Sequence, residues 1–255
     1  QFAGMSSARL SVDMGDMGVI AFDQGSGSGL GTIDDKTPTA AEEIWDGLDT
    51  DATTGVGGLV GAAGASGVFN YVNTFSGVTL NAAARTGSGA KSADGASSGA
   101  NGQAWDFALT TDGTMMGVDG LAIGAGYGEV ESGTGTNSTD GDDEHMTVFA
   151  NYSVGPVTLG YQVSEIVKGK KGSANQETHA WGVAFNVNEN LSVSYGEREV
   201  SFQTDANVEE KGDGIAIAYT MGSMKIAGNR NEVSDNNGTK NSGDSMTEVA
   251  LSFAF

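Results

Sequence analysis

The chain has 255 residues and a formal net charge of −21, with 41 glycines, 2 prolines and no cysteine. The excess of acid opposes nucleic-acid binding, which requires clustered Lys and Arg. Without cysteine there is neither a disulfide framework nor a thiolate metal site, and no stretch approaches the roughly 20 apolar residues of a membrane-spanning helix.

Apolar and small residues alternate along the chain with the two-residue period of a β-strand. About thirteen strands are predicted in chain order, at 7–13, 16–23, 67–74, 76–86, 103–112, 119–129, 143–154, 156–166, 176–187, 190–201, 211–221, 222–231 and 244–255. One face of each is apolar, and the other carries mostly Gly, Ala, Ser, Thr and Asn. This pattern suits a barrel with lipid outside and water or packed small groups inside, or a soluble sandwich that buries its apolar face.

The links between these strands alternate strictly between short and long. The short links lie near 14–16, 74–77, 113–118, 154–156, 187–190 and 221–223, and the long ones near 24–66, 87–102, 131–144, 167–176, 202–212 and 232–244. Tight turns at one end and long loops at the other are typical of outer-membrane barrels. We therefore predict an all-β fold, a transmembrane antiparallel β-barrel, with residues 1–255 forming one domain. Because bacterial barrels have even strand numbers, we expect further strands before Gln1.

The last strand, from Met246 to the terminal Phe255, looks like the C-terminal strand of outer-membrane proteins. Val249, Leu251 and Phe253 alternate with small or polar residues, and the chain ends on an aromatic residue. Few soluble proteins end on an aromatic residue in this register, so the motif favours the barrel.

The stretch from Asp16 to Phe75 resembles the general diffusion porins of Gram-negative bacteria. The run 17–22 (MGVIAF) leads into a loop of about forty residues, and the segments 57–59, 69–71 and 75–80 are similar to the loop exit, the next strand and the following turn of those porins. The matching residues cover about a quarter of the chain, whereas the strand pattern covers nearly all of it.

The resemblance implies a sixteen-stranded barrel in the bacterial outer membrane that passes small hydrophilic solutes and ions by passive diffusion, and not an enzyme. If residues 9–13 form strand four, the count reaches sixteen at Phe255. The implied partners are two further copies in a homotrimer, outer-membrane lipid and lipopolysaccharide. The acidity predicts a preference for cations.

In such porins the third loop folds into the barrel and narrows it, with its acids facing arginines on the opposite wall. The resemblance assigns this constriction loop to residues 24–65. The candidate acids are Asp34, Asp35, Glu42, Glu43 and Asp46. The alternative is a solvated external loop.

A short helix is expected within this loop. Thr39 and Glu42 have the spacing of a capping box and follow Pro38. Ile44 and Trp45 would then anchor the loop against the wall of the barrel.

Basic residues on inward strand faces are candidates for the opposite side of the constriction. Arg9 lies opposite the apolar face of its strand, and so does Arg85, and both match strands that carry arginines in the resembled porins. Arg198 and Lys225 also fall on inward faces and are possible pore-lining residues. The alternative for each is a simple local ion pair.

An acidic run near residue 140 is a weak candidate for calcium. Its members are Asp140, Asp142, Asp143 and Glu144. Calcium prefers several oxygen ligands, but the spacing of an EF-hand loop is absent and a solvated loop tip explains the run as well. No other cofactor is expected.

Two rival functions remain open on the sequence alone. One is a soluble or surface-attached acidic β-rich structural or adhesive protein, which would bury the apolar strand faces. The other is a substrate-specific barrel, which would place aromatic residues along its lumen. The two histidines, His145 and His179, have no neighbouring nucleophile, so a catalytic triad has no support.

Overall fold

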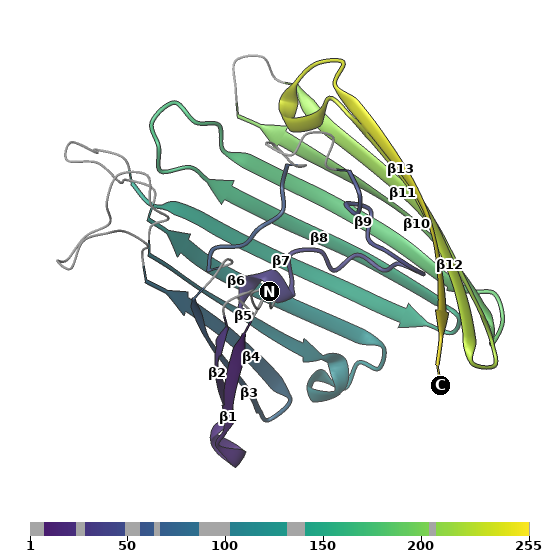
Figure 1. Cartoon of the computed structure of the whole chain (residues 1–255), viewed down its shortest axis with the longest axis horizontal. Coiled ribbons are helices and arrows are strands. Elements are labelled where there is room, and N and C mark those ends of the chain that lie inside the picture. Colours follow the sequence, from purple (N-terminus) through teal and green to yellow (C-terminus); the bar gives the residue numbers. More distant parts are fainter. Residues whose placement is uncertain are drawn as a thin grey trace, which may run out of the picture.

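In the computed structural model, residues 8–23, 29–48, 57–63, 67–86, 103–131, 141–203 and 208–254 are described. Their strands form one antiparallel sheet in chain order (Figure 1). The strands are β1 (Arg9–Asp13), β2 (Val19–Asp23), β3 (Val68–Phe75), β4 (Val78–Arg85), β5 (Ala104–Asp112), β6 (Leu121–Val130), β7 (Asp143–Val154), β8 (Val157–Val167), β9 (Gln176–Asn186), β10 (Leu191–Phe202), β11 (Glu209–Met221), β12 (Met224–Ser234) and β13 (Gly243–Phe253). Each of the thirteen predicted strands is confirmed and overlaps its predicted range.

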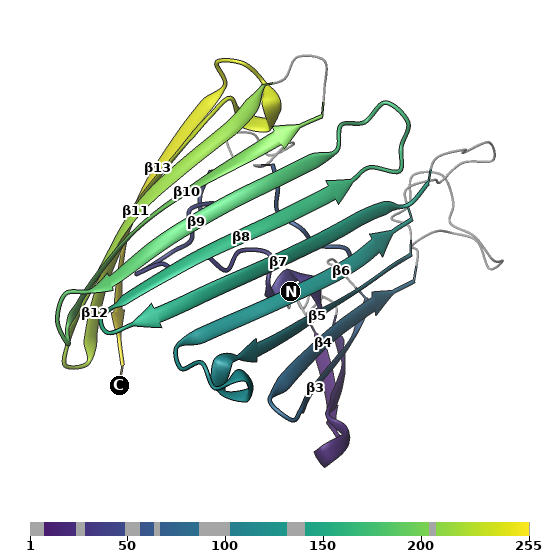
Figure 2. The same cartoon turned by 180° about the vertical axis from the view of Figure 1, so that it is seen from behind.

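Each strand pairs only with its neighbours in the chain, so the sheet is a continuous meander. The pairing of β10 with β11, for example, runs from Leu191 opposite Tyr219 to Ser201 opposite Glu209. The sheet curves strongly, as Figures 1 and 2 show from opposite sides, and one face is concave. Within the described part of the chain, β1 and β13 form its two edges.

The two faces of the sheet differ in the way that the alternation predicts. On β11, Ile215 and Ile217 are exposed on the convex outer face, whereas Ala216 and Ala218 are buried on the concave inner face. The same outer face carries exposed apolar side chains on every strand from β1 to β13. An apolar surface this continuous is unusual on a soluble protein and is what hydrocarbon lipid requires.

Short turns join the strands at one end of the sheet, and longer links join them at the other. At 76–77 both Ser76 (φ 50°) and Gly77 (φ 86°) have positive φ. Positive φ at both positions is the type I′ geometry that matches the twist of a two-residue hairpin. The predicted alternation is confirmed for most links, but it is not strict: the 113–120 link is as long as the 168–175 link, and the 203–208 link is shorter than both.

Four short 3₁₀ helices complete the regular structure of the described residues. They are η1 (Gly15–Met17), η2 (Leu30–Thr32), η3 (Gly113–Met116) and η4 (Asn236–Gly238). None of the helices in the described ranges is long and apolar enough to cross a membrane.

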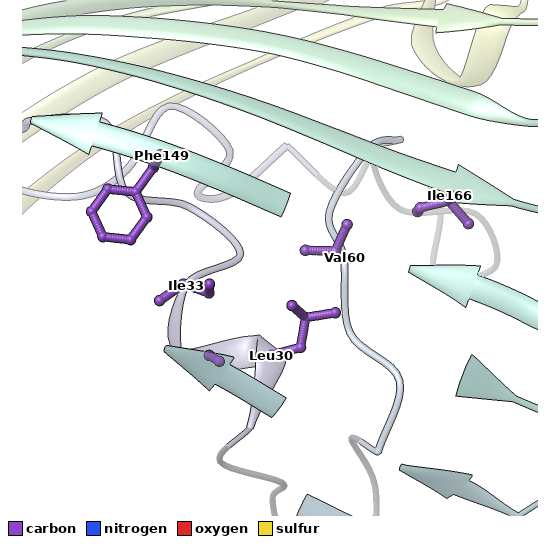
Figure 3. Packing of buried hydrophobic residues seen from close by; sticks show 6 residues of the cluster. Leu30, Ile33, Val60, Phe149 and Ile166 are labelled. Atoms are coloured by element: carbon purple, nitrogen blue, oxygen red, sulfur yellow. The ribbon is translucent and has the colours of Figure 1, made fainter. Parts of the chain in front are cut away.

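The link between β2 and β3 lies against the concave face of the sheet (Figures 1 and 2). We call its described residues, 29–48 and 57–63, the inner loop. Leu30, Ile33 and Val60 of this loop form a buried cluster with Phe149 of β7 and Ile166 of β8 (Figure 3), which Ala108 of β5 completes. Burial of each large apolar side chain contributes about 1.5–3 kcal/mol. The hydrophobic core of the molecule therefore lies between the inner loop and the wall.

Candidate pore constriction

The outward arm of the inner loop, residues 29–48, is hydrogen-bonded to the wall strand by strand. The polar wall residues are Asp106 of β5, Asn151 of β7, Gln162 of β8, Ser194 of β10 and Asn231 of β12. Gln162 makes the most of these bonds: its side-chain oxygen accepts from Lys36 N at 2.6 Å, and its nitrogen donates to the carbonyls of Ile33 and Asp34 at 2.8 and 2.9 Å. The arm therefore crosses the wall from β5 to β12.

The return arm, residues 57–63, follows a similar path back. Its wall partners are Glu210 of β11, Gln176 and Thr178 of β9, His145 of β7 and again Asp106. The Asp106 side chain is buried and accepts from Leu30 N at 2.9 Å, Ala62 N at 3.2 Å and Ala63 N at 2.6 Å. One carboxylate thus holds the beginning and the end of the loop together.

Glycines on the inner face leave room for the loop to approach this closely. A Cβ added to Gly160 would lie 2.2 Å from Pro38 Cδ, and one added to Gly126 would lie 2.5 Å from Leu30 Cδ1. Both distances are far below van der Waals contact. The small side chains of the inner face therefore serve partly to seat the loop.

The predicted helix at Thr39 is absent, and residues 40–47 form bends and turns instead. The Thr39 hydroxyl donates to the Glu42 carbonyl at 2.7 Å. Asn231 of the wall donates to the carbonyls of Glu43 and Asp46. Bonds to the wall thus satisfy backbone groups that a helix would have paired internally, so tertiary contacts override the capping box.

The predicted anchors, Ile44 and Trp45, are buried and pack with Ala180 of β9 and with Leu59 of the return arm. Both side chains therefore lie between the two arms of the loop and the wall. This part of the prediction needed only the apolar character of two adjacent residues in a polar loop.

The five candidate acids lie together on the outward arm. Asp34, Asp35, Glu43 and Asp46 are half-buried, and Glu42 is exposed. Burial raises the pKa of Asp35 to about 7, and repulsion from Asp34 and Glu43 adds to the shift, while Lys36 opposes it. Partial loss of water also raises the pKa of Glu42, with repulsion from neighbouring carboxylates, including Glu248 of β13.

The two candidate arginines lie on the strands next to the ends of the loop. Arg9 is on the inner face of β1, where it faces Asp23 of β2 across 3.6 Å, so the local-ion-pair interpretation applies to it. Arg85 ends β4 on the same face, opposite Val68 and Ala104 in the register of the sheet. The structure therefore separates these bases from the acids of the outward arm by several strands.

The model of the Gram-negative porin family matches residues 1–255. The chain belongs to this family. Porins are β-barrel channels, so membership places the protein in the bacterial outer membrane as a channel and not an enzyme. Membership of this family contradicts the soluble or surface-attached alternative, which would bury the apolar strand faces that are exposed here.

Solved structures agree with this assignment at the level of the fold. A porin structure refined at 1.8 Å has 14% identity and a TM-score of 0.67 over 94% of this chain and 79% of that chain. OmpT of Vibrio cholerae has 12% identity and a TM-score of 0.61 (97% and 79%). The outer membrane channel DcaP of Acinetobacter baumannii has 13% and 0.60 (97% and 84%). The comparison with curated proteins finds no significant match.

The prediction that Arg198 lines the open pore of this porin is wrong. Its side chain points to the inner face as expected, but it is fully buried there. It is ion-paired with Glu210, and its guanidinium lies 5.2 Å from the centre of the Trp45 ring. Lys225, by contrast, is exposed on the inner face of β12, and its charge acts on Glu42 of the loop.

The acidic run of the porin does not gather into a metal site where it is described. Asp140 lies outside the described residues, and Asp142 precedes β7. Asp143 accepts from Lys168 Nζ at 2.9 Å, whereas the Glu144 side chain points to the other face. No group of three His, Cys, Asp or Glu residues within the described ranges is placed to hold a metal ion.

Proposed function

We propose that this porin passes small hydrophilic solutes and ions by passive diffusion and prefers cations, with the inner loop as the constriction. The observation that supports this most is the position of the loop, which is hydrogen-bonded across the concave wall and carries five acids. Charges that line a narrow aqueous passage select ions of opposite sign.

The wall next to the loop tip adds to the acidic field. Gly47 packs against Met246 of β13, so the tip reaches the last strand. Glu248 follows two residues later on the same inner face of β13, opposite Asn229. Lys225 is a base on this part of the wall. Arg9 and Arg85, on the strands beside the ends of the loop, would give the field a direction across the lumen.

The proposed assembly is a homotrimer in outer-membrane lipid and lipopolysaccharide. The exposed apolar outer face supports the contact with lipid. A second structure of OmpT of Vibrio cholerae is described as a trimer form. It has 10% identity to this chain and a TM-score of 0.51. Cations are the proposed preferred permeant ions.

The test is the conductance and reversal potential of the complete protein in a planar bilayer under a KCl gradient. We expect ohmic current steps in groups of three and a reversal potential of the sign set by K⁺. A variant with Glu42→Gln, Glu43→Gln and Asp46→Asn should move the potential towards zero. Glu189→Gln, an exposed acid in the short 187–190 link, is the matched control and should leave it unchanged.

Three results would contradict parts of the proposal. Folded protein without channels would remove the diffusion function. A potential of the sign set by Cl⁻ would overturn the cation preference, and an unchanged potential in the triple variant would show that the loop acids do not set selectivity.

A further inference from the structure

Two fully buried charged side chains lie beneath the inner loop, apart from the five acids of its outward arm. Arg198 of β10 and Glu210 of β11 form an ion pair in which neither side chain is exposed to solvent. Two charges in the protein interior lose their hydration, and such a pair is a weak source of stability compared with apolar packing. Its position between two loops points to a different use.

The Glu210 carboxylate is shared between the inner loop and the link from β12 to β13. One oxygen accepts from Arg198, and the other accepts from Gly57 N at 3.1 Å and from Asn237 N at 2.7 Å. Gly57 belongs to the return arm of the inner loop. Asn237 belongs to η4, at the end of the sheet where the long links lie, which in outer-membrane barrels is the external end.

The Phe202 side chain also contacts both the inner loop and the link from β12 to β13. A Cβ added to Gly57 would lie 2.7 Å from Cζ of Phe202, and one added to Gly238 would lie 3.0 Å from Cδ2 of the same ring. Both backbones therefore rest directly on Phe202. On the other side, the Arg198 guanidinium lies over Trp45, so the ion pair also contacts the outward arm of the loop.

We propose that Arg198 and Glu210 are positioning residues that couple the external link 235–242 to the inner loop, so that a change in the link alters ion flow. The inference rests on the proposed role of the inner loop as the constriction. Displacing Asn237 removes one bond from the buried carboxylate and admits water to it, which weakens its bond to Gly57. The coupling is reciprocal, because the external link and the inner loop both donate to the same Glu210 carboxylate.

Some buried donors around the ion pair have no acceptor. Nε and Nη2 of Arg198 and Nε1 of Trp45 are buried and have no hydrogen-bond partner among the described residues. Buried donors without acceptors raise the free energy of the arrangement in which both loops contact Glu210. A moderate disturbance of the external link can therefore shift the loop between arrangements.

These 255 residues contain no cysteine, so a thiol introduced among them is the only one in this chain. Lys240→Cys places a thiol on the exposed external link, and Ser173→Cys places one on the exposed 168–175 link as the matched control. Each complete protein is inserted into a planar bilayer, and its conductance is recorded before and after reaction with a bulky polyethylene glycol maleimide. We expect about a twofold change for the label at 240 and little for the label at 173.

The same labels are then added in the Glu210→Ala background, where the link and the inner loop no longer share an acceptor. The effect of the label at 240 should disappear there. If Glu210→Ala does not fold, Arg198→Met with Glu210→Leu replaces it, because this pair of changes leaves neither an unpaired buried charge nor a shared acceptor at position 210.

An equal effect with and without the ion pair would mean that the label only obstructs the channel mouth, and would overturn the coupling. The absence of any effect in channels that conduct normally would also overturn it, while the proposed function would stand. Unlabelled folded protein without channels would instead remove the proposed function, and the coupling with it.

Discussion

Asp35 lies in the inner loop, half-buried beside Asp34 and Lys36, and its charge depends on pH near neutrality. Burial raises the pKa of its carboxyl group to about 7. Because the raised pKa means that the proton is retained at higher pH, the carboxylate is charged above about pH 7 and neutral well below it. The field of the constriction should therefore weaken as pH falls.

We predict that the cation preference decreases between about pH 8 and about pH 6, a range in which ordinary carboxyl groups stay charged. The reversal potential under a KCl gradient measures it at each pH. Asp35→Asn should abolish this step, whereas Glu189→Gln should retain it. The same step in Asp35→Asn would show that another group titrates.

At the scale of the element, the inner loop depends on Asp106 of β5, whose carboxylate accepts from both arms of the loop. Asp106→Ala leaves the N–H groups of Leu30, Ala62 and Ala63 without their acceptor. An unsatisfied buried donor costs about 1–3 kcal/mol. We expect a loss of at least about 2 kcal/mol in the free energy of unfolding, together with noisier open-channel current.

Asp112→Ala is the matched control for this prediction, because Asp112 ends the same strand and caps η3 away from the loop. It should leave the current noise unchanged. Equal noise in both variants would show that Asp106 does not restrain the loop, and unfolding in denaturant measures the energetic part separately.

The elements differ in how much of them the sequence could predict. Strand alternation is local, and the outer face of Ile215 and Ile217 follows from period two alone. The inner loop depends on distant partners: Asp106 is 76 residues from Leu30, and Asn231 is 185 residues from Asp46. Asp106 is recognisable from the sequence only as a charged residue at an inward strand position, and nothing local identifies its partners in the loop.

The same reasoning explains the two errors at the candidate site. A capping box describes only local bonds, so it could not anticipate the donation from Asn231 that replaces the helix at Thr39. Strand register placed Arg198 inward correctly, but exposure depends on what covers the residue. Trp45 and Glu210 cover it, and they come from separate parts of the chain.

At the scale of the whole molecule, the sheet has an outer face that contacts lipid and an inner face that contacts the inner loop and the aqueous lumen. Neighbouring residues on one strand therefore meet different environments: Leu109 of β5 is exposed on the outer face, while Thr110 lines a space of about 430 Å³ on the inner face. A lysine on the lipid face of a barrel costs about 2–4 kcal/mol at the bilayer midplane, whereas one in the lumen stays hydrated.

We predict that Leu109→Lys destabilises the protein folded in lipid vesicles, reducing its free energy of unfolding by up to about 3 kcal/mol. Thr110→Lys should change this free energy by less than about 1 kcal/mol. Folding of both variants is followed in a urea titration with lipid present. The two substitutions add the same charge to adjacent residues, so a difference can come only from the face. If the two variants lost equal stability, the outer face would not contact hydrocarbon at this depth. If Thr110→Lys lost more, the assignment of inside and outside would be reversed.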